Sequence, residues 1–216
     1  MLSKKEKDLI CGIILGDGSI GVWNNSATIY CGHGSKQKDY VDYKLSLLKK
    51  ELPQYFSNVK ICTKIVNFNN KQFLQYYFSK TSKDFLFLHE EYCNLKSFMK
   101  NIKSDRSVSL WFMDDGCVIK SWRRLKNGDK SYSRPSIKLC TYCFSEEENL
   151  MLCNWFERKY QIKPHVLTER KRDKVYYFLK FNADETYSLY KKVLKNYIEC
   201  CQSMRDKFQW LIDYYK

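Results

Sequence analysis

The sequence lacks any apolar run that approaches the roughly 18 residues of a membrane-spanning helix, so we expect no membrane partner. Residues 1–8 include acids and lack the apolar region of a secretory signal, and they do not resemble a transit peptide. We therefore expect the protein to act inside the reducing compartment where it is made. That compartment is either an organelle (mitochondrion or chloroplast) or a bacterial or phage cytoplasm.

Histidines are few, and cysteine pairs are poorly placed. His33, His89 and His165 show no metal-ligand spacing, and no Asn/His partner pattern around His33 indicates a ββα-metal nuclease. The ten cysteines are scattered, mostly in apolar patterns such as that around Cys62, which favours free buried thiols over disulfides. The spacing of residues 140–143 (CTYC) suits zinc, but no second pair or His cluster accompanies it. We expect no structural zinc.

Basic residues are in clear excess. The 216 residues include 38 Lys and Arg against 24 Asp and Glu, which gives a net charge of +14 and a pI of about 9.2. At 44% hydrophobic residues the chain can still build a packed core of one or two domains. The charge indicates a polyanionic partner, with nucleic acid the leading candidate, although a solvated basic surface is the alternative.

One short pattern occurs twice. Residues 10–18 (ICGIILGDG) and 108–116 (VSLWFMDDG) are each an apolar, helix-length segment that ends in a carboxylate followed by glycine. If the two helices pack side by side, Asp17 and Asp115 lie close together at one end. Paired carboxylates on a basic surface suit metal-dependent phosphodiester cleavage. The alternative is that each Asp-Gly pair only terminates a helix.

The segments after each motif also repeat, in the order helix, hairpin, helix, hairpin, helices. Residues 76–80 (YYFSK) match residues 176–180 (YYFLK) at an offset of 100, close to the motif offset of 98. This duplication predicts two domains, residues 1–103 and 104–216. The expected strands are 19–23, 27–33, 59–65, 72–80, 117–123, 136–144, 163–169 and 175–182, and the expected helices include 38–52, 84–102 and one that begins at Ser145.

The two motifs, of which the second contains residues 111–116 (WFMDDG), resemble those of the LAGLIDADG homing endonucleases in their single-chain, two-motif, intron-encoded form. Leu15 and Gly16 depart from the nine-letter pattern of the first motif. The resemblance implies an α+β fold with two pseudo-symmetric αββαββα subdomains, whose antiparallel sheets form a DNA-binding saddle. Gly12 and Gly16 would let the motif helices approach closely, with Ser109 facing them from the second.

The resemblance also implies a function. Such enzymes cut a long, asymmetric site in double-stranded DNA, leave staggered ends, and thereby spread the intron that encodes them. We expect a monomer that uses two or three Mg²⁺ ions shared between the two motif aspartates. The alternative is an RNA maturase that helps its own intron RNA to splice, or a DNA-binding protein that does not cleave, on the same scaffold.

Individual site residues follow from the resemblance. Asp17 and Asp115 take the place of the metal-binding acids, and the backbone carbonyls of Gly16 and Asp114 are further candidate ligands. Lys96 and Lys207 are the candidates for a basic residue near each scissile phosphate. Lys80 and Lys180 are alternatives that end similar strands.

Base and phosphate contacts would come from polar residues on the strands and hairpin tips. The candidates are Trp23, Asn24, Asn25, Lys36, Lys60, Lys64, Asn69, Lys71, Gln72, Gln75, Lys80, Lys120, Trp122, Arg123, Arg134, Lys138, Arg170, Lys171, Arg172, Lys174 and Lys180.

Overall fold

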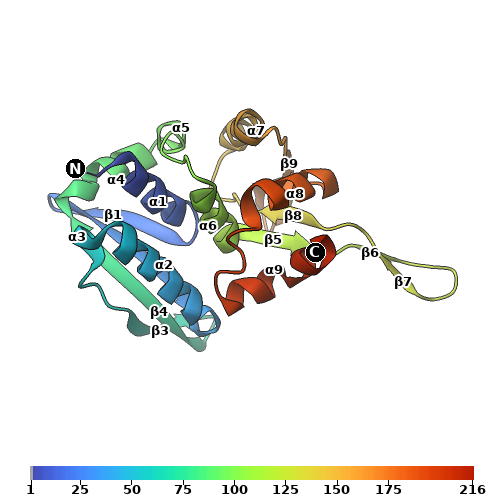
Figure 1. Ribbon diagram of the computed structural model, residues 1–216, viewed down its shortest axis with the longest axis horizontal. Helices are drawn as coiled ribbons and strands as arrows, with labels where there is room; N and C mark the ends of the chain where they lie inside the picture. Colours follow the sequence, from blue (N-terminus) through green and yellow to red (C-terminus); the bar gives the residue numbers. More distant parts are fainter. Residues whose placement is uncertain (1) are drawn as a thin grey trace. The chain divides into compact units, whose positions relative to one another are not determined.

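The computed structural model describes residues 2–216, except for the side chain of Arg123. These residues form two compact units (Figure 1). Unit 1 runs to Asp114 and includes Glu199–Met204, and unit 2 consists of Asp115–Ile198 and Arg205–Lys216. No helix within residues 2–216 combines the length and the apolar character needed to cross a membrane. The domain boundary at residue 103, which the sequence duplication predicts, stays a prediction.

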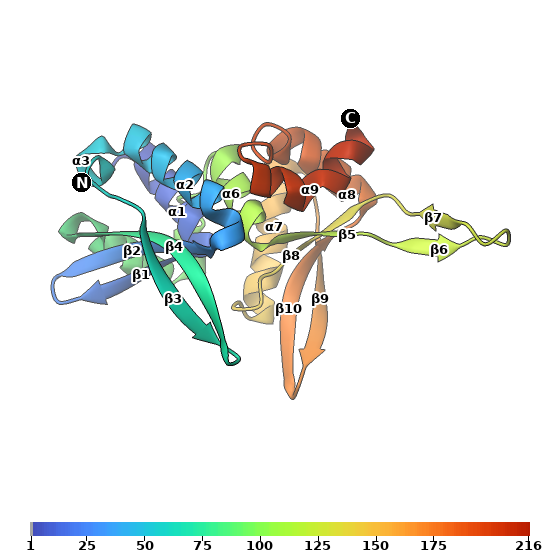
Figure 2. The same ribbon diagram turned by 90° about the horizontal axis from the view of Figure 1, so that it is seen from below.

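Unit 1 is a four-stranded antiparallel sheet in the order β1-β2-β4-β3, with helices α1 and α2 on one side (Figure 2). Ser3 begins α1 with a capping box. The elements are α1 (Lys4–Leu15), β1 (Gly18–Trp23), β2 (Ser26–Gly34), η1 (Ser35–Gln37), α2 (Lys38–Glu51), α3 (Pro53–Phe56), β3 (Cys62–Phe68), β4 (Lys71–Ser82), η2 (Lys83–Phe85), α4 (Leu86–Tyr92), α5 (Leu95–Phe98) and α6 (Asp105–Asp115).

Unit 2 repeats this topology with a second antiparallel sheet in the order β5-β8-β10-β9. The helix expected to begin at Ser145 is α7, which that residue caps with a second capping box. The elements are β5 (Gly116–Ile119), β6 (Trp122–Arg124), β7 (Lys130–Tyr132), β8 (Ser136–Leu139), α7 (Glu146–Tyr160), β9 (His165–Lys171), β10 (Lys174–Phe181), α8 (Ala183–Leu189), the π-helix η3 (Tyr190–Leu194) and α9 (Gln202–Tyr215).

Several predicted boundaries are wrong. The strand expected at 117–123 divides into β5 and β6, and β6 pairs with β7 in a separate two-stranded ribbon (Figure 1). The strand expected at 136–144 ends at Leu139. In unit 1, β3 begins only at Cys62, and Ile65 is exposed. The end of β3 extends away from the helices (Figure 2), so its apolar alternation does not mark a buried face.

The two motif helices pack against each other inside unit 1, as the sequence predicted. A Cβ atom added to Gly12 would lie 2.7 Å from Ser107, and one added to Gly16 would lie 2.1 Å from Asp114. Only glycine allows this approach. Ser107 therefore fills the place that the sequence assigned to Ser109.

Pairing within each sheet aligns the two units. Gly18 pairs with Cys31 and Cys31 with Phe78, while Gly116 pairs with Leu139 and Leu139 with Leu179. The matching residues of β4 and β10 thus differ by 101, one more than the sequence match indicated. A shift of one residue reverses the side of the sheet that a side chain faces.

The cysteines are all free thiols, but only Cys11, Cys31 and Cys153 are buried. Cys62 is exposed because it pairs with Tyr77 on the side of the sheet that faces away from α1 and α2. The expectation that most thiols are buried is wrong.

Candidate active site

Asp17 occupies the short junction between α1 and β1. A Cβ atom on the next residue, Gly18, would lie 2.4 Å from the backbone oxygen of Ile13, so glycine is needed for β1 to leave the helix this closely. The Asp17 side chain is 48% exposed. The Asp-Gly pair therefore turns the chain and leaves a carboxylate accessible to solvent.

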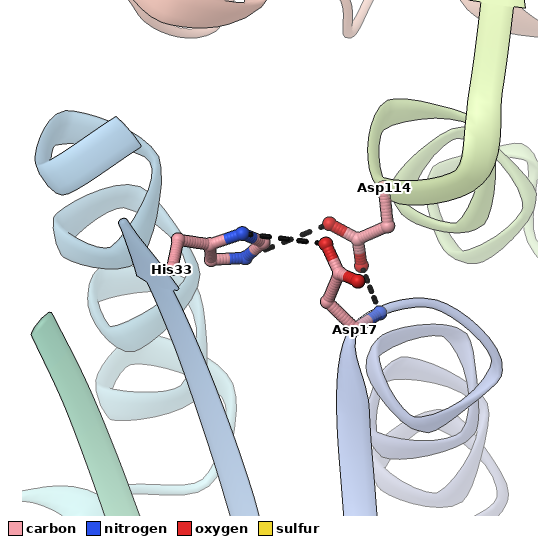
Figure 3. A group of neighbouring side chains, drawn as sticks. All are labelled: Asp17, His33 and Asp114. Atoms are coloured by element: carbon pink, nitrogen blue, oxygen red, sulfur yellow. Dashed lines mark hydrogen bonds and ion pairs between the residues drawn. The ribbon is translucent and has the colours of Figure 1, made fainter. Parts of the chain in front are cut away.

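Three side chains point toward one another at this junction (Figure 3). The Asp17 backbone N–H donates a hydrogen bond to Asp114 Oδ2 at 3.0 Å, and Asp17 Oδ2 lies 3.3 Å from His33 Nδ1. His33 Nε2 lies 3.6 Å from Asp114 Oδ1. One ligand atom from each residue lies within 4.8 Å of the other two, a spacing that can hold a metal ion.

Lys44 already supplies a positive charge to this group. Its side chain and that of Asp114 are completely buried. The ammonium donates to both Asp114 oxygens, at 2.6 and 2.7 Å, and contacts His33 Nε2 at 2.9 Å. Burial is the largest influence on the pKa of Lys44 and lowers it, but the charge of Asp114, its hydrogen bond and the neighbouring Cys31 and Asp17 together raise that pKa above its ordinary value.

A divalent ion therefore fits only part of the cluster. Lys44 engages His33 and Asp114, whereas the half-exposed Asp17 carboxylate faces solvent. Magnesium prefers oxygen ligands and keeps several of its waters, so one carboxylate is a sufficient anchor from this unit. The donor set fits an ion bound by Asp17 and water.

Asp115 occupies the matching junction of unit 2, at the end of α6 and directly before β5. It is half-buried, and its backbone carbonyl accepts a hydrogen bond from the Cys140 N–H at 3.0 Å. The two motif acids thus take the same place in the two repeats, one residue before the glycine that begins each first strand.

The helix-free side of the unit 1 sheet carries a group that we call the tyrosine–lysine cluster: Tyr30, Lys64, Gln75 and Tyr77. The two tyrosine rings stack with centroids 5.4 Å apart, and Lys64 Nζ lies 4.8 and 5.2 Å from those centroids. The Tyr30 hydroxyl donates to Gln75 Oε1 at 3.0 Å. Aromatic contacts orient the Lys64 ammonium and leave its charge available to an anion.

The same side of the unit 2 sheet carries what we call the Glu169 cluster: Lys138, Tyr142, Glu169 and Lys171. Glu169 lies 2.5 Å from Lys138 Nζ and 3.6 Å from Lys171 Nζ, and it also accepts a hydrogen bond from the Tyr142 hydroxyl. The hydrogen bonds from Lys138 and Tyr142 lower the pKa of Glu169 to about 2. Two lysines here share one carboxylate.

Comparison with known proteins identifies the family. Residues 7–189 match the model of the LAGLIDADG DNA endonuclease family. The chain belongs to this family. No curated protein matches the sequence.

Solved structures share the LAGLIDADG fold. The homing endonuclease I-WcaI bound to its DNA recognition sequence matches with a TM-score of 0.70 at 19% identity, covering 96% of this chain and 87% of that chain. Mesophilic variants of I-DmoI match with a TM-score of 0.51 at 13% identity, covering 89% and 97%. A variant of I-DmoI in complex with its target DNA in the presence of Mn matches with a TM-score of 0.52 at 14% identity, covering 90% and 96%. The predicted fold class is confirmed.

Within this LAGLIDADG fold, the predicted basic catalytic residues lie on short or late helices. Lys96 is exposed on α5, and Lys207 is half-buried on α9 with its ammonium 5.7 Å from the Phe208 ring. The Asp114 side chain, whose backbone carbonyl was a candidate metal ligand, is bound to Lys44. The assignments of Asp17, Asp115, Lys96 and Lys207 to catalysis remain predictions.

Pairing places the predicted DNA contacts on the two sides of each sheet. Those on the helix-free side are Trp23, Lys64, Lys71, Gln75, Lys138, Lys171, Lys174 and Lys180. Those on the opposite side are Gln72, Lys80 and Arg170. We leave Lys80 out of the proposed DNA surface because it pairs with the buried Ile29 on the helix side.

The remaining predicted contacts lie at turns and beside the sheets. Arg134 forms an ion pair with Asp184 at 2.7 Å. The Arg123 side chain lies outside the described residues. Those at turns or in flanking segments are Asn24, Asn25, Lys36, Lys60, Asn69, Lys120 and Arg172, and Trp122 is on β6.

Sequence reasoning missed two residues of the site. His33 was set aside because it has no ligand spacing, and Lys44 was not considered. Both had a usable signal. His33 alternates with the apolar residues of β2, and Lys44 lies one helical turn from Tyr40 and from Leu48, which are both buried.

Proposed function

We propose that the protein is a magnesium-dependent endonuclease that cuts both strands of a long, asymmetric DNA site. The cuts would be staggered and would promote homing of the intron that encodes the protein. The observation that carries the proposal is the repeated junction: Asp17 and Asp115 hold the same position in two repeats of a LAGLIDADG chain. Each aspartate lies at the end of a motif helix and directly precedes the first strand of a sheet. The helix-free side of each sheet carries lysines.

In this mechanism the chain anchors the ions and the DNA. Bound divalent ions would activate a water, neutralise the scissile phosphate and assist the leaving oxygen. Asp17 and Asp115 would share two or three such ions. Lys64, Lys138 and their neighbours on the helix-free sides would hold phosphates and fix the register of the duplex.

Cleavage selection from a randomised double-stranded DNA library with Mg²⁺ present tests the proposal. We expect enrichment of one long, asymmetric site and staggered cuts at its centre. Binding to an enriched site without cutting would favour the maturase or binding-only alternative instead.

The selected site then allows a test of each acid. Asp17→Asn and Asp115→Asn should each keep DNA binding but lower double-strand cleavage by about 100-fold or more, because loss of an ion costs several kcal/mol of transition-state stabilisation. Asp213→Asn is the matched control, since Asp213 is exposed on α9 and contacts Gln209. Undiminished cutting by both motif variants would refute the catalytic assignment.

A further inference from the structure

Lys44 determines which atom of His33 carries a proton. A lysine ammonium can only donate hydrogen bonds, so the 2.9 Å contact with His33 Nε2 requires a lone pair on that nitrogen. The proton of the neutral imidazole is then on Nδ1. This nitrogen faces Asp17 Oδ2 at 3.3 Å, so His33 donates toward the Asp17 carboxylate.

The same ammonium holds the second neighbour of Asp17. Lys44 binds both oxygens of Asp114, and Asp114 Oδ2 also accepts the Asp17 backbone N–H. Lys44 therefore reaches Asp17 by two routes: through His33 to the carboxylate, and through Asp114 to the backbone. The side chains of Lys44, His33 and Asp114 are each at most 2% exposed.

We propose that Lys44 is a positioning residue: an internal ammonium that occupies the space between His33 and Asp114 in place of a metal ion and thereby orients Asp17. This inference rests on the proposed function, in which Asp17 anchors a divalent ion. Hydrogen bonds that orient a ligand residue typically change metal affinity or activity by about 10- to 100-fold. Lys44 would thus keep the ion off His33 and Asp114, with Asp17 as its ligand from this unit.

The tautomer of His33 gives a test that does not depend on cleavage. The full-length protein, labelled with ¹⁵N at its three histidines, should show His33 with a protonated Nδ1 and an unprotonated Nε2 at a fixed, mildly alkaline pH. His33→Gln identifies the signals. In Lys44→Met, the proton should move to Nε2, where Asp114 Oδ1 lies 3.6 Å away. A protonated Nε2 in the unmodified protein would overturn the inference, even if the protein cleaves DNA.

The second measurement is the Mg²⁺ concentration for half-maximal single-turnover cleavage of the selected site. Lys44→Met should raise it by about 10- to 100-fold without changing DNA affinity in the absence of divalent ions. Lys50→Met is the matched control, because Lys50 is an exposed lysine on the same helix and should leave the concentration unchanged.

A double variant separates positioning from charge balance. Lys44→Met combined with Asp114→Asn leaves no buried lysine or aspartate in this cluster, so it should fold even if Lys44→Met alone does not. We expect the double variant still to need more Mg²⁺. Wild-type Mg²⁺ dependence in the double variant would show that Lys44 only neutralises Asp114 and would overturn the proposal. Absence of cleavage by the unmodified protein would count against the proposed function, while the His33 tautomer would still decide the role of Lys44.

Discussion

The buried face of α2 in unit 1 carries Lys44, whereas the matching place on α7 in unit 2 carries Leu152. The match follows from the shared topology, since buried residues of the two units recur 108 positions apart. The pairs are Cys31 and Leu139, His33 and Thr141, Val41 and Asn149, Lys44 and Leu152, and Leu48 and Phe156. One repeat thus places a charge where the other places a hydrocarbon.

The buried polar networks of the two units differ in the same way, because one is neutral and the other is charged. In unit 2, the Thr141 hydroxyl donates to Asn149 Oδ1, and the Asn149 amide donates to the carbonyls of Phe144 and Ser145 at 3.2 and 2.9 Å. This network is neutral and local. In unit 1 a histidine, a lysine and an aspartate from three distant segments form a charged one. Equal topology therefore does not impose equal chemistry on the two motif acids.

The largest expected effect of this difference is on stability. Lys44→Met leaves the Asp114 carboxylate buried without its cation, which should lower the free energy of unfolding by about 3–5 kcal/mol. Leu152→Met at the matching position conserves volume and should cost less than about 1.5 kcal/mol. Urea unfolding of the two variants measures both. Equal midpoints would mean that the buried pair does not form in solution.

The topology of both units was predictable because short-range patterns specify it. Apolar segments that end in Asp-Gly, and turns such as Asn69-Asn70, determine the order of helices and hairpins. Both of those asparagines have positive φ, as a two-residue hairpin turn requires. The position of His33 also follows from a turn, the one at Asn24-Asn25 between β1 and β2. Trp23 pairs with Ser26 across this turn, and extending the same register along β2 places His33 across from Gly16, beside the motif acid Asp17.

The charged network was not predictable, because Asp114 and Lys44 lie 70 residues apart and meet only through the packing of α6. The sides of the strands were also uncertain. The sequence match of residues 76–80 with 176–180 differs by one residue from the pairing, so Lys80 and Lys180 face opposite sides of their sheets. The β6–β7 ribbon was missed because it is polar and lacks an apolar alternation.

DNA binding should also differ between the helix-free sides of the two units. Pairing places Lys64 of unit 1 opposite Gln75 and Glu169 of unit 2 opposite Tyr176, at matching positions of opposite charge. Lys64→Met should weaken binding and reduce the slope of log K against log salt by about 0.9, the value of one phosphate contact. Glu169→Gln should strengthen binding and steepen the slope, since it releases Lys138 and Lys171. Titrations of the selected site at several salt concentrations, without divalent ions, measure both slopes. A weaker complex for Glu169→Gln would show that the Glu169 cluster orients its lysines rather than neutralising them.

The smallest effect is the contribution of Glu169 in unit 2 to the pH dependence of stability. Hydrogen bonds from Lys138 and Tyr142 lower the Glu169 pKa from 4.5 to about 2 in the folded state. Because the folded pKa is below the unfolded one, the stabilisation is complete above about pH 4.5 and is lost as the pH falls toward 2. Glu169→Gln should therefore flatten the pH dependence of the urea midpoint within this window, by a modest amount because the carboxylate is exposed to solvent. Glu147→Gln, at an exposed glutamate of α7, is the control and should follow the unmodified protein. An unchanged slope for Glu169→Gln would mean that Lys138 and Lys171 are already directed away from Glu169 in solution, and that the two helix-free sides are equally available to DNA.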